Sequence, residues 1–361
     1  MNNDKPFEGL LVIELASVLA GPLVGTFFSE LGARVIKVEN KKGGVGDVTR
    51  SWKLPTEPIE QKYSAYYCSA NYCKESLFMD LSLKDDKEAL NELLQKADIV
   101  ISNYRKLTAQ KLGVSYEEVK KVNEKIIFAN INGYGADSNR PAYDVVVQAE
   151  TGFMYMNGAA NSPPTKMPVA LMDVLAAHQL KEGILVALLK KERTGQGSSV
   201  SVSLFDAGIA SLANQATNYL IADTIPQRIG SQHPNIAPYG DLFYTSDNLP
   251  IVLAIGSDVH FNKMCSILEI TSDKIKNVFD SNTKRIKNRG KLVDMLKSAI
   301  KKWKRAILIQ RLEQEGVPAG AVLNMEEVFE QAGVGEELVL KEQMPDGKLV
   351  KKVKTVVFKM T

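Results

Sequence analysis

Asp173 is the residue of this chain whose type and position could most readily do chemistry. It interrupts the apolar run Pro168-Val-Ala-Leu-Met-Asp-Val-Leu-Ala-Ala-His178, in which helical spacing predicts a helix that starts near Leu171. The carboxylate then falls in the first turn, where free backbone N–H groups and the helix dipole favour its ionised form. An ionised carboxylate can act as a nucleophile, but Asp is also a preferred N-cap residue. Covalent catalysis and helix capping are therefore both open from this residue alone.

The segments that must position Asp173 alternate between strand and helix patterns. Short apolar runs predict strands at residues 10–16, 34–39, 77–81, 99–102, 126–131 and 199–204. Amphipathic spacing predicts helices at residues 20–31, 84–97 and 116–123, and an apolar helix at 205–221. Alternation of this kind predicts an α/β fold with a Rossmann-like open parallel sheet.

A change of composition after residue 200 divides the chain. Residues 1–200 form the expected large α/β domain, and residues 201–225 form a linker helix. Pro and Gly residues then punctuate a loop, followed by strand patterns at 241–245 and 251–255 and by several Lys-rich helices. We expect residues 226–324 to form a smaller α+β domain.

Composition excludes several classes of protein. The 361 residues carry 45 basic and 42 acidic side chains, a balance that argues against a nucleic-acid-binding protein. The three cysteines, Cys68, Cys73 and Cys265, contain no C-x-x-C pair, and no cluster of His, Asp and Glu has metal-ligand spacing. The start lacks a signal-peptide pattern, and no apolar run is long enough to cross a bilayer. We expect a cytoplasmic protein with reduced thiols, no bound metal and no membrane partner.

No G-x-G-x-x-G follows the first strand, which argues against an NAD-dependent dehydrogenase. An ordered set of other motifs spans most of the chain. These are Val18-Leu-Ala-Gly-Pro22, Leu31-Gly-Ala-Arg-Val-Ile-Lys-Val-Glu39, Gly46-Asp47, Thr49-Arg50, Asn71, Lys74, Asn103-Tyr104-Arg105, Leu112-Gly113, Gly133-Tyr-Gly135, Tyr143-Asp144, Gln148, Gly152, the Asp173 segment, Arg193-Thr-Gly-Gln-Gly197 and Val200-Ser-Val-Ser-Leu204. In this order they resemble the class III CoA-transferases, the CaiB/BaiF family, which includes formyl-CoA transferase, carnitine CoA-transferase and alpha-methylacyl-CoA racemase.

The resemblance implies an enzyme that moves CoA from an acyl-CoA donor to a carboxylic acid acceptor. The catalytic aspartate of the family falls on Asp173, which would pass through aspartyl anhydride and aspartyl-CoA thioester intermediates. Coenzyme A and acyl-CoA are then substrates, and no tightly bound cofactor is implied. The positions that contact CoA in the family are Val18, Lys74, Asn103, Tyr104 and Lys111.

Three positions are expected to lie beside the substrate, namely Leu19, Tyr143 and Asp144. Formyl-CoA transferase has a glutamine in place of Leu19 and an arginine in place of Asn40, so the resemblance leaves the acceptor acid open. The first alternative is an acyl-CoA racemase, whose histidine would fall at Tyr143. An ordinary tyrosine, with a pKa of about 10, is a poor base at neutral pH, which disfavours racemisation.

The resemblance also implies an interlocked homodimer, with a large domain completed by about residues 325–361. The active site would lie between the large domain of one subunit and the small domain of the other, covered by the loop 230–240. A second alternative is a non-catalytic CoA-binding protein that keeps the fold. Retention of a carboxylate at Asp173 argues against it.

Overall fold

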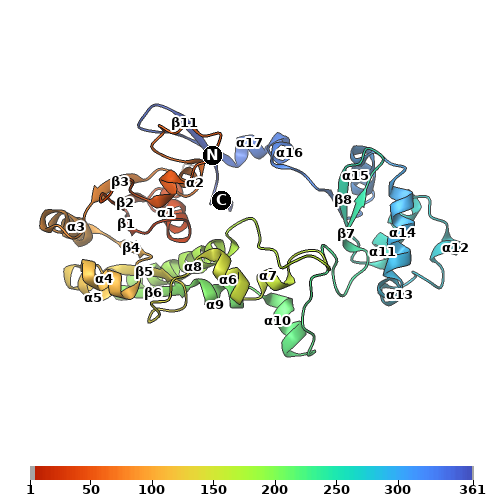
Figure 1. Cartoon of the computed structure of the whole chain (residues 1–361), viewed down its shortest axis with the longest axis horizontal. Helices are drawn as coiled ribbons and strands as arrows, with labels where there is room; N and C mark the ends of the chain where they lie inside the picture. Colours follow the sequence, from red (N-terminus) through yellow and green to blue (C-terminus); the bar gives the residue numbers. More distant parts are fainter. Residues whose placement is uncertain (1–4, 360–361) are drawn as a thin grey trace. The chain divides into compact units, whose positions relative to one another are not determined.

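The computed structural model describes residues 5–359 of the chain, so the opening residues that bear on a signal peptide lie partly outside it. The described chain forms two compact units (Figure 1). The first contains the chain up to Phe153, Lys166–Thr224 and the segment from Gly333 onward, and the second contains Met154–Thr165 and Ile225–Ala332. These units differ from the expected domains in two respects. Residues 154–165 and 325–332 were expected in the large domain but belong to the second unit, and most of the predicted linker, residues 201–225, belongs to the first unit.

The first unit is built on a six-stranded parallel sheet of order β3-β2-β1-β4-β5-β6, the order of the doubly wound Rossmann sheet. Its strands are β1 (Leu11–Leu15), β2 (Arg34–Asn40), β3 (Glu75–Met79), β4 (Ile99–Ser102), β5 (Ile127–Asn132) and β6 (Ser198–Ser203). The sheet thus confirms the predicted α/β class and the predicted strands to within two residues at each end. The strand order reverses between β1 and β4, and a ligand crevice is expected at the carboxyl ends of strands at such a point.

Helices cover both faces of this sheet (Figure 1). One apolar layer is formed by α1 (Ala20–Glu30), α6 (Asp144–Glu150), α8 (Leu171–Thr194) and α9 (Leu204–Ala210), and the other by α3 (Lys84–Lys96), α4 (Lys106–Leu112) and α5 (Tyr116–Val122). Successive residues of a strand point to opposite faces, so Val12 joins the first layer and Ile13 the second. The remaining helices of the unit are α2 (Ala65–Ala70), α10 (Ala213–Leu220) and α17 (Val334–Glu337), and the short α7 (Phe153–Met156) straddles the boundary between the units.

Helix α1 lies unusually close to β1 because two of its residues are glycines. A Cβ at Gly21 would lie 2.4 Å from the Cβ of Ala16, and a Cβ at Gly25 would lie 1.9 Å from Oε2 of Glu14. Only glycine therefore lets α1 pack over the end of β1 while the Glu14 carboxylate remains between them.

The predicted helix over residues 205–221 is wrong as a single element. It is divided into α9 and α10, and the break falls where Ala213 adopts a φ of 47°, outside the helical region. Apolar content alone does not reveal such a break, because both halves keep helical spacing.

The end of the chain folds back onto the first unit as an antiparallel hairpin of β10 (Val339–Gln343) and β11 (Leu349–Val353). Glu30, at the end of α1, accepts hydrogen bonds from the backbone N–H groups of Thr355 and Val356 at 2.9 Å and from Nζ of Lys352 at 2.6 Å. The ion pair is almost fully buried. The carboxylate of Glu30 therefore clamps the C-terminal segment to α1.

The second unit has its own apolar core and a three-stranded antiparallel sheet, ordered β7 (Tyr239–Tyr244), β8 (Pro250–Ala254), β9 (Ala319–Ala321). Its helices are α11 (Asp258–Ile267), α12 (Ser272–Ile275), α13 (Asn282–Lys287), α14 (Arg289–Ile300), α15 (Arg305–Gln314) and α16 (Met325–Glu330). Arg285 is buried in this unit and pairs with Asp258 at 2.6 Å, so a charge is held inside the small core by a specific partner. Within residues 5–359, none of the helices has the length and apolar character that crossing a membrane requires.

Candidate active site

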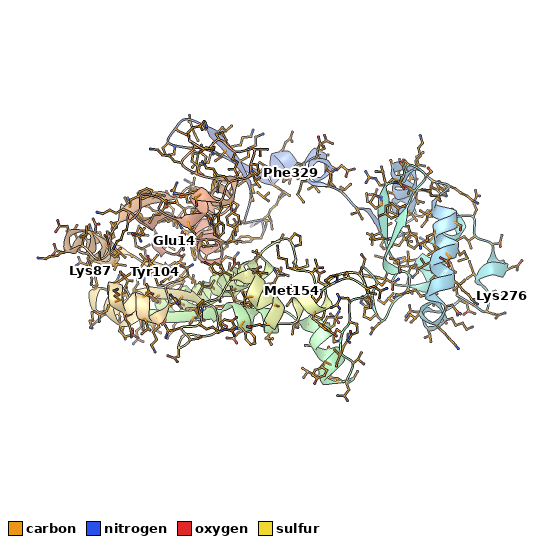
Figure 2. The ribbon with its side chains drawn as sticks, viewed as in Figure 1. Glu14, Lys87, Tyr104, Met154, Lys276 and Phe329 are labelled. Carbon is orange, nitrogen blue, oxygen red and sulfur yellow. The ribbon has the colours of Figure 1, made fainter. Side chains whose placement is uncertain are left out.

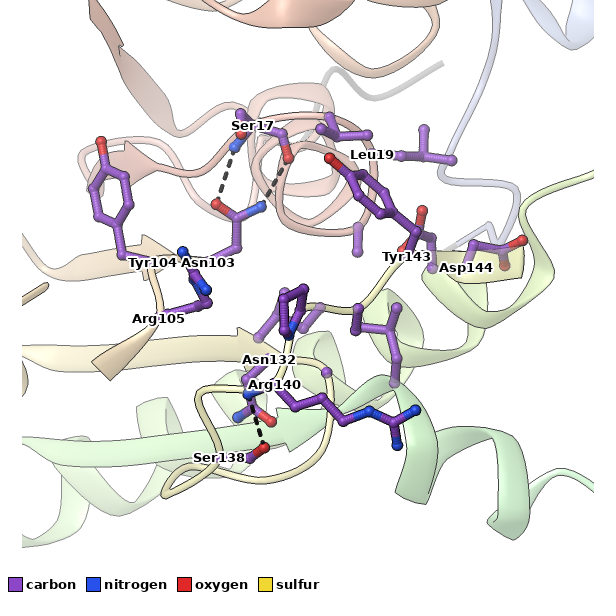
Figure 3. Close-up of a pocket in the computed structure, with 18 of the residues that line it drawn as sticks. Ser17, Leu19, Asn103, Tyr104, Arg105, Asn132, Ser138, Arg140, Tyr143 and Asp144 are labelled. Carbon is purple, nitrogen blue, oxygen red and sulfur yellow. Dashed lines mark hydrogen bonds between the residues drawn. The ribbon is translucent and has the colours of Figure 1, made fainter. Parts of the chain in front are cut away.

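A pocket of about 410 Å³ opens in the first unit where the strand order reverses (Figure 3). Its wall combines residues that follow the carboxyl ends of β1, β4 and β5 with residues of α6 and α8. Seven of the nine predicted site residues line it, namely Val18, Leu19, Asn103, Tyr104, Tyr143, Asp144 and Asp173. The fold thus brings together side chains that are as much as 155 residues apart, from Val18 to Asp173.

Asp173 is in the first turn of α8, which begins at Leu171 as predicted. Its carboxylate accepts no hydrogen bond from any residue that the structure describes, and it is removed from much of the solvent. Burial and the negative charge of Asp144 raise the pKa of Asp173 from 3.8 to about 7. The expectation of a readily ionised carboxylate was therefore wrong, because burial and a like charge outweigh the position at the helix start. The result is a carboxyl that changes its charge near neutral pH.

Asp144 and Gln148, both on α6, hold the segment that leads into Asp173. Oδ1 of Asp144 accepts a hydrogen bond from the N–H of Met172 at 2.7 Å, and Oε1 of Gln148 accepts one from the N–H of Met167 at 2.8 Å. The side chain of Gln148 also donates to Oδ2 of Asp144 at 2.6 Å. The alternative of helix capping by Asp173 itself is not supported, since Asp144 supplies the carboxylate that caps the helix start.

The turn after β1 is held in a strained conformation beside the site. Val18 has a φ of 72°, which is rare for a β-branched residue, and such a conformation persists only where surrounding contacts impose it. Asn103 forms paired hydrogen bonds with the backbone of Ser17, accepting from its N–H at 3.2 Å and donating to its carbonyl at 2.8 Å (Figure 3). Asp47 accepts the N–H of Val18 at 3.3 Å. Asn103, predicted to contact CoA, thus also shapes the turn.

Asp47 belongs to a buried ion cluster beneath this turn. Nζ of Lys37 lies 2.9 Å from carboxylate oxygens of both Glu14 and Asp47, and all three side chains are almost inaccessible to solvent. Glu14 lies inside the first unit (Figure 2). Burial lowers the pKa of Lys37, but the two carboxylates raise it more, so the net pKa lies above its ordinary value. The Lys37 ammonium therefore stays charged and holds Asp47, which accepts the N–H of Val18, in place.

Lys74 joins the same cluster and does not line the pocket. Its buried Nζ lies 2.7 Å from Oε2 of Glu14 and also donates to the carbonyls of Pro22 and Ala70 at 2.8 and 2.7 Å. Burial lowers the pKa of Lys74 to about 8, although Glu14 opposes the shift. This geometry counts against the predicted contact of Lys74 with a CoA phosphate, because all three N–H groups are already directed to protein acceptors.

The positive side chains that do line the pocket are Arg105 and Arg140. Arg105 is exposed, precedes α4 as its N-cap residue, and makes one long hydrogen bond to the carbonyl of Asn139 at 3.4 Å. Arg140 pairs with Glu150 and lies over the ring of Tyr134. Lys111, predicted to contact CoA, is an exposed residue of α4 outside the pocket wall. Its contact with CoA stays a prediction.

A second, smaller pocket of about 330 Å³ shares Leu19 and Asp144 with the first. It is lined further by Tyr66, Ser69, Val145, Lys166, Pro168, Val169 and Ala170. Figure 3 shows Leu19, Tyr143 and Asp144 gathered on one side of the main pocket. These are the residues predicted to lie beside the substrate, and two of them, Leu19 and Asp144, line both pockets.

Sequence reasoning missed the roles of Glu14, Lys37, Asp47 and Gln148. A signal was present, since charged residues inside the apolar strands 10–16 and 34–39 are costly to bury unless they pair with one another. Among the residues described, no group of three or more His, Cys, Asp and Glu side chains could hold a metal ion.

Comparison with known proteins gives the class of this fold and site. The model of "CoA-transferase family III" matches residues 7–361. The chain is 35% identical over 334 residues to succinate–glutarate CoA-transferase of Agrobacterium fabrum, covering 91% of this chain and 82% of the relative. It is 35% identical over 326 residues to acetyl-CoA:oxalate CoA-transferase of Acetobacter aceti, covering 89% and 82%.

A solved structure supports the same assignment. The crystal structure of a CaiB/BaiF family protein from Brucella suis superposes with a TM-score of 0.86 at 35% identity, covering 98% of this chain and 92% of the other. The chain therefore belongs to CoA-transferase family III. It is an enzyme that transfers CoA between an acyl-CoA and a carboxylic acid, and CoA is its substrate.

Proposed function

We propose that this enzyme transfers CoA between short dicarboxylic acids through covalent intermediates on Asp173. The observation that carries the proposal is the position of Asp173, on the wall of a pocket that also presents two arginines, where no group of residues 5–359 donates a hydrogen bond to its carboxylate. The two relatives compared above are named for the dicarboxylates succinate, glutarate and oxalate, and the name of the second also gives acetyl-CoA. Their names support this class of acid for the present chain.

The chemistry begins with attack of the ionised Asp173 carboxylate on the thioester carbonyl of the donor. This forms a mixed acyl–aspartyl anhydride and releases CoA thiolate. The thiolate attacks the aspartyl carbonyl, releases the donor acid and leaves an aspartyl-CoA thioester. The acceptor carboxylate then displaces CoA thiolate to form a second anhydride, and the thiolate attacks its acyl carbon. The products are the new acyl-CoA and free Asp173.

Each of these steps passes through a tetrahedral oxyanion, which backbone N–H donors stabilise. Leu19 and Ala20 line the pocket at the start of α1, and no side chain in the described part of the chain caps that helix end. We assign the free first-turn N–H groups of α1 to this role. The Val18 turn, fixed by Asn103 and Asp47, sets their position.

Arg105 and Arg140 lie on the wall on which we place CoA, with Val18, Asn103 and Tyr104. Guanidinium groups suit phosphates because they donate in a planar fork. Burial raises the pKa of Tyr104, in keeping with a phenol that stays neutral against the nucleotide. No tightly bound cofactor is required by this scheme.

The active form is proposed to be an interlocked homodimer in the cytoplasm. Exposed apolar side chains at the end of α10 support a partner surface, since Leu220 is 73% and Ile221 80% exposed. The free thiols support a reducing compartment.

Sedimentation measures whether the protein is a dimer, and mixed dimers test whether two subunits share an active site. Asp173→Ala and a variant of loop 230–240, each inactive alone, are expected to recover activity when co-assembled, whereas no recovery would count against it.

The covalent mechanism is tested by intact-mass spectrometry after incubation with succinyl-CoA, with hydroxylamine added to trap the acyl–enzyme. Wild type is expected to give a CoA adduct or a hydroxamate on Asp173, and Asp173→Ala neither. The matched control is Glu182→Ala, an exposed acidic residue on the same helix, which should retain the adduct. An adduct that survives in Asp173→Ala would refute the assignment.

A further inference from the structure

The smaller pocket contains the features of a carboxylate site. It shares Leu19 and Asp144 with the main pocket and is not lined by Val18, Asn103 or Tyr104, the residues beside which we place CoA. Its volume of about 330 Å³ is at the low end of the range of about 300–1,000 Å³ found for ligand sites, and so suits a small acid rather than CoA. Its apolar lining of Leu19, Val145, Pro168 and Val169 suits a short methylene chain.

Lys166 is the one positively charged side chain among the residues that line this pocket. It is exposed, and its Nζ makes a single long hydrogen bond, at 3.3 Å, to the carbonyl of the adjacent Met167. No acidic group among the described residues pairs with it within 4.0 Å. An ammonium in this state is free to bind an anion, unlike Lys74, whose N–H groups are taken up inside the fold.

Tyr66 supplies a second donor and links the pocket to the reacting residue. Its hydroxyl forms no hydrogen bond with any group that the structure describes. Burial, followed by the charges of Asp173 and Asp144, raises the pKa of Tyr66, so the phenol stays protonated and its charge state is coupled to Asp173. A ligand that reaches from Asp173 past Leu19 would therefore meet a neutral O–H donor.

Asp144 is the one acidic residue in the pocket lining, and both of its oxygens are engaged by neutral donors. Its two oxygens accept hydrogen bonds from the Met172 N–H and from Gln148, at 2.7 and 2.6 Å. The carboxylate is therefore held by other groups and does not compete for Lys166. An anion in the pocket consequently has Lys166 and Tyr66 as partners.

We infer that this pocket binds the distal carboxylate of a dicarboxylic acid, with Lys166 as its ion-pair partner and Tyr66 as a hydrogen-bond donor, while the proximal carboxylate reacts at Asp173. The inference rests on the proposed function and adds the residues that select the acid. Lys166 then determines specificity and is not itself part of the covalent chemistry.

The test compares two acceptors of equal chain length, glutarate and pentanoate, which differ in the distal carboxylate alone. Lys166→Met is expected to raise the KM for glutarate about tenfold or more and to leave that for pentanoate unchanged, as loss of a charge-assisted contact requires. Tyr66→Phe should act in the same direction but less strongly. The control is Lys190→Met, because Lys190 is an exposed lysine near the opposite end of α8 from Asp173. It should change neither the KM for glutarate nor the KM for pentanoate.

Equal effects of Lys166→Met on both acids, or none on glutarate, would overturn the inference. Calorimetric titration of each protein with glutarate and with pentanoate gives a readout that does not need turnover. Wild type is expected to bind glutarate more tightly, and Lys166→Met to lose that preference; a wild type without preference refutes the site. The adduct of Asp173 with succinyl-CoA tests the proposed function separately from this inference. If the adduct forms but glutarate is not preferred over pentanoate, the proposed function stands and the carboxylate site is refuted.

Discussion

Oδ1 of Asp144 lies 2.7 Å from the backbone nitrogen of Met172, the residue before Asp173, and the negative charge of Asp144 adds to burial in raising the pKa of Asp173. One carboxylate thus both fixes the start of α8 and makes the neighbouring carboxyl harder to ionise. The two effects oppose each other chemically, because a well-positioned nucleophile is made less ionised by the group that positions it.

Asp144→Asn separates these effects. Asn keeps an oxygen that can accept the Met172 N–H but removes the charge, so the pKa of Asp173 should fall below about 7. The rate of adduct formation, measured in a single turnover from pH 5 to 9, is expected to rise with pH as Asp173 ionises. In Asp144→Asn the midpoint of this rise should move to lower pH. The control Glu182→Gln should leave the midpoint in place. An unchanged midpoint in Asp144→Asn would contradict electrostatic coupling.

Asp173→Asn is expected to stabilise the fold at alkaline pH. The pKa of Asp173 is about 7 in the folded protein and 3.8 as the ordinary value, so the native state binds the proton more tightly than the unfolded chain does. Stability is therefore lost as pH rises from about 4 through 7 and the carboxyl ionises. A neutral Asn avoids this loss and should raise the free energy of unfolding by about 1–3 kcal/mol at pH 8. The difference from wild type should vanish toward pH 4. Urea unfolding at several pH values measures it; a difference independent of pH would refute this origin.

Gly25→Ala tests the close approach of α1 to the buried ion cluster. The added methyl would meet the carboxylate of Glu14, which is held between Lys37 and Lys74 and has no room to move. We expect a loss of about 2–4 kcal/mol in the free energy of unfolding. Gly290→Ala, in α14 of the second unit with open space around it, should instead be neutral or stabilising by up to about 1 kcal/mol. Similar effects at both positions would show that packing at Gly25 is not special.

Glu30→Ala should release the C-terminal hairpin. The substitution leaves the buried ammonium of Lys352 without its partner and removes the acceptor of two backbone N–H groups. Loss of one partner of a buried pair costs about 3–5 kcal/mol. Hydrogen exchange is expected to accelerate at Thr355 and Val356, while the exposed Glu8→Ala leaves it unchanged. Slow exchange that persists in Glu30→Ala would mean that other contacts hold the hairpin.

Much of the sheet was predictable because its signals are local. Buried parallel strands such as Ile99–Ser102 are short apolar runs between polar segments, and the start of α8 follows from apolar spacing around Leu171. The hairpin β10–β11 was not predicted. Its strands, Val-Leu-Lys-Glu-Gln and Leu-Val-Lys-Lys-Val, are polar at about half their positions and are held by Glu30, more than 300 residues earlier.

The site was predictable only in part, because several of its contacts join residues that are far apart in the sequence. Motifs singled out Asp173, Val18 and Asn103, which the fold brings to one pocket, and their roles there stay predictions. The charge state of Asp173 was predicted wrongly because it depends first on burial and then on Asp144, a residue 29 positions earlier in the chain that only the fold brings near. Lys74 was taken for a ligand contact because nothing local shows that Glu14 lies beside it.

The coupling between Tyr66 and Asp173 makes this phenol a built-in indicator of the reaction. Burial contributes most to the raised pKa of Tyr66, and the charge of Asp173 adds to it. Acylation turns the Asp173 carboxylate into an uncharged anhydride or thioester, so that this added contribution disappears. The phenol should titrate at lower pH in the covalent intermediate than in the free enzyme. Ultraviolet absorbance of the tyrosinate, compared between wild type and Tyr66→Phe, would then follow the loading and unloading of Asp173 in time without a label.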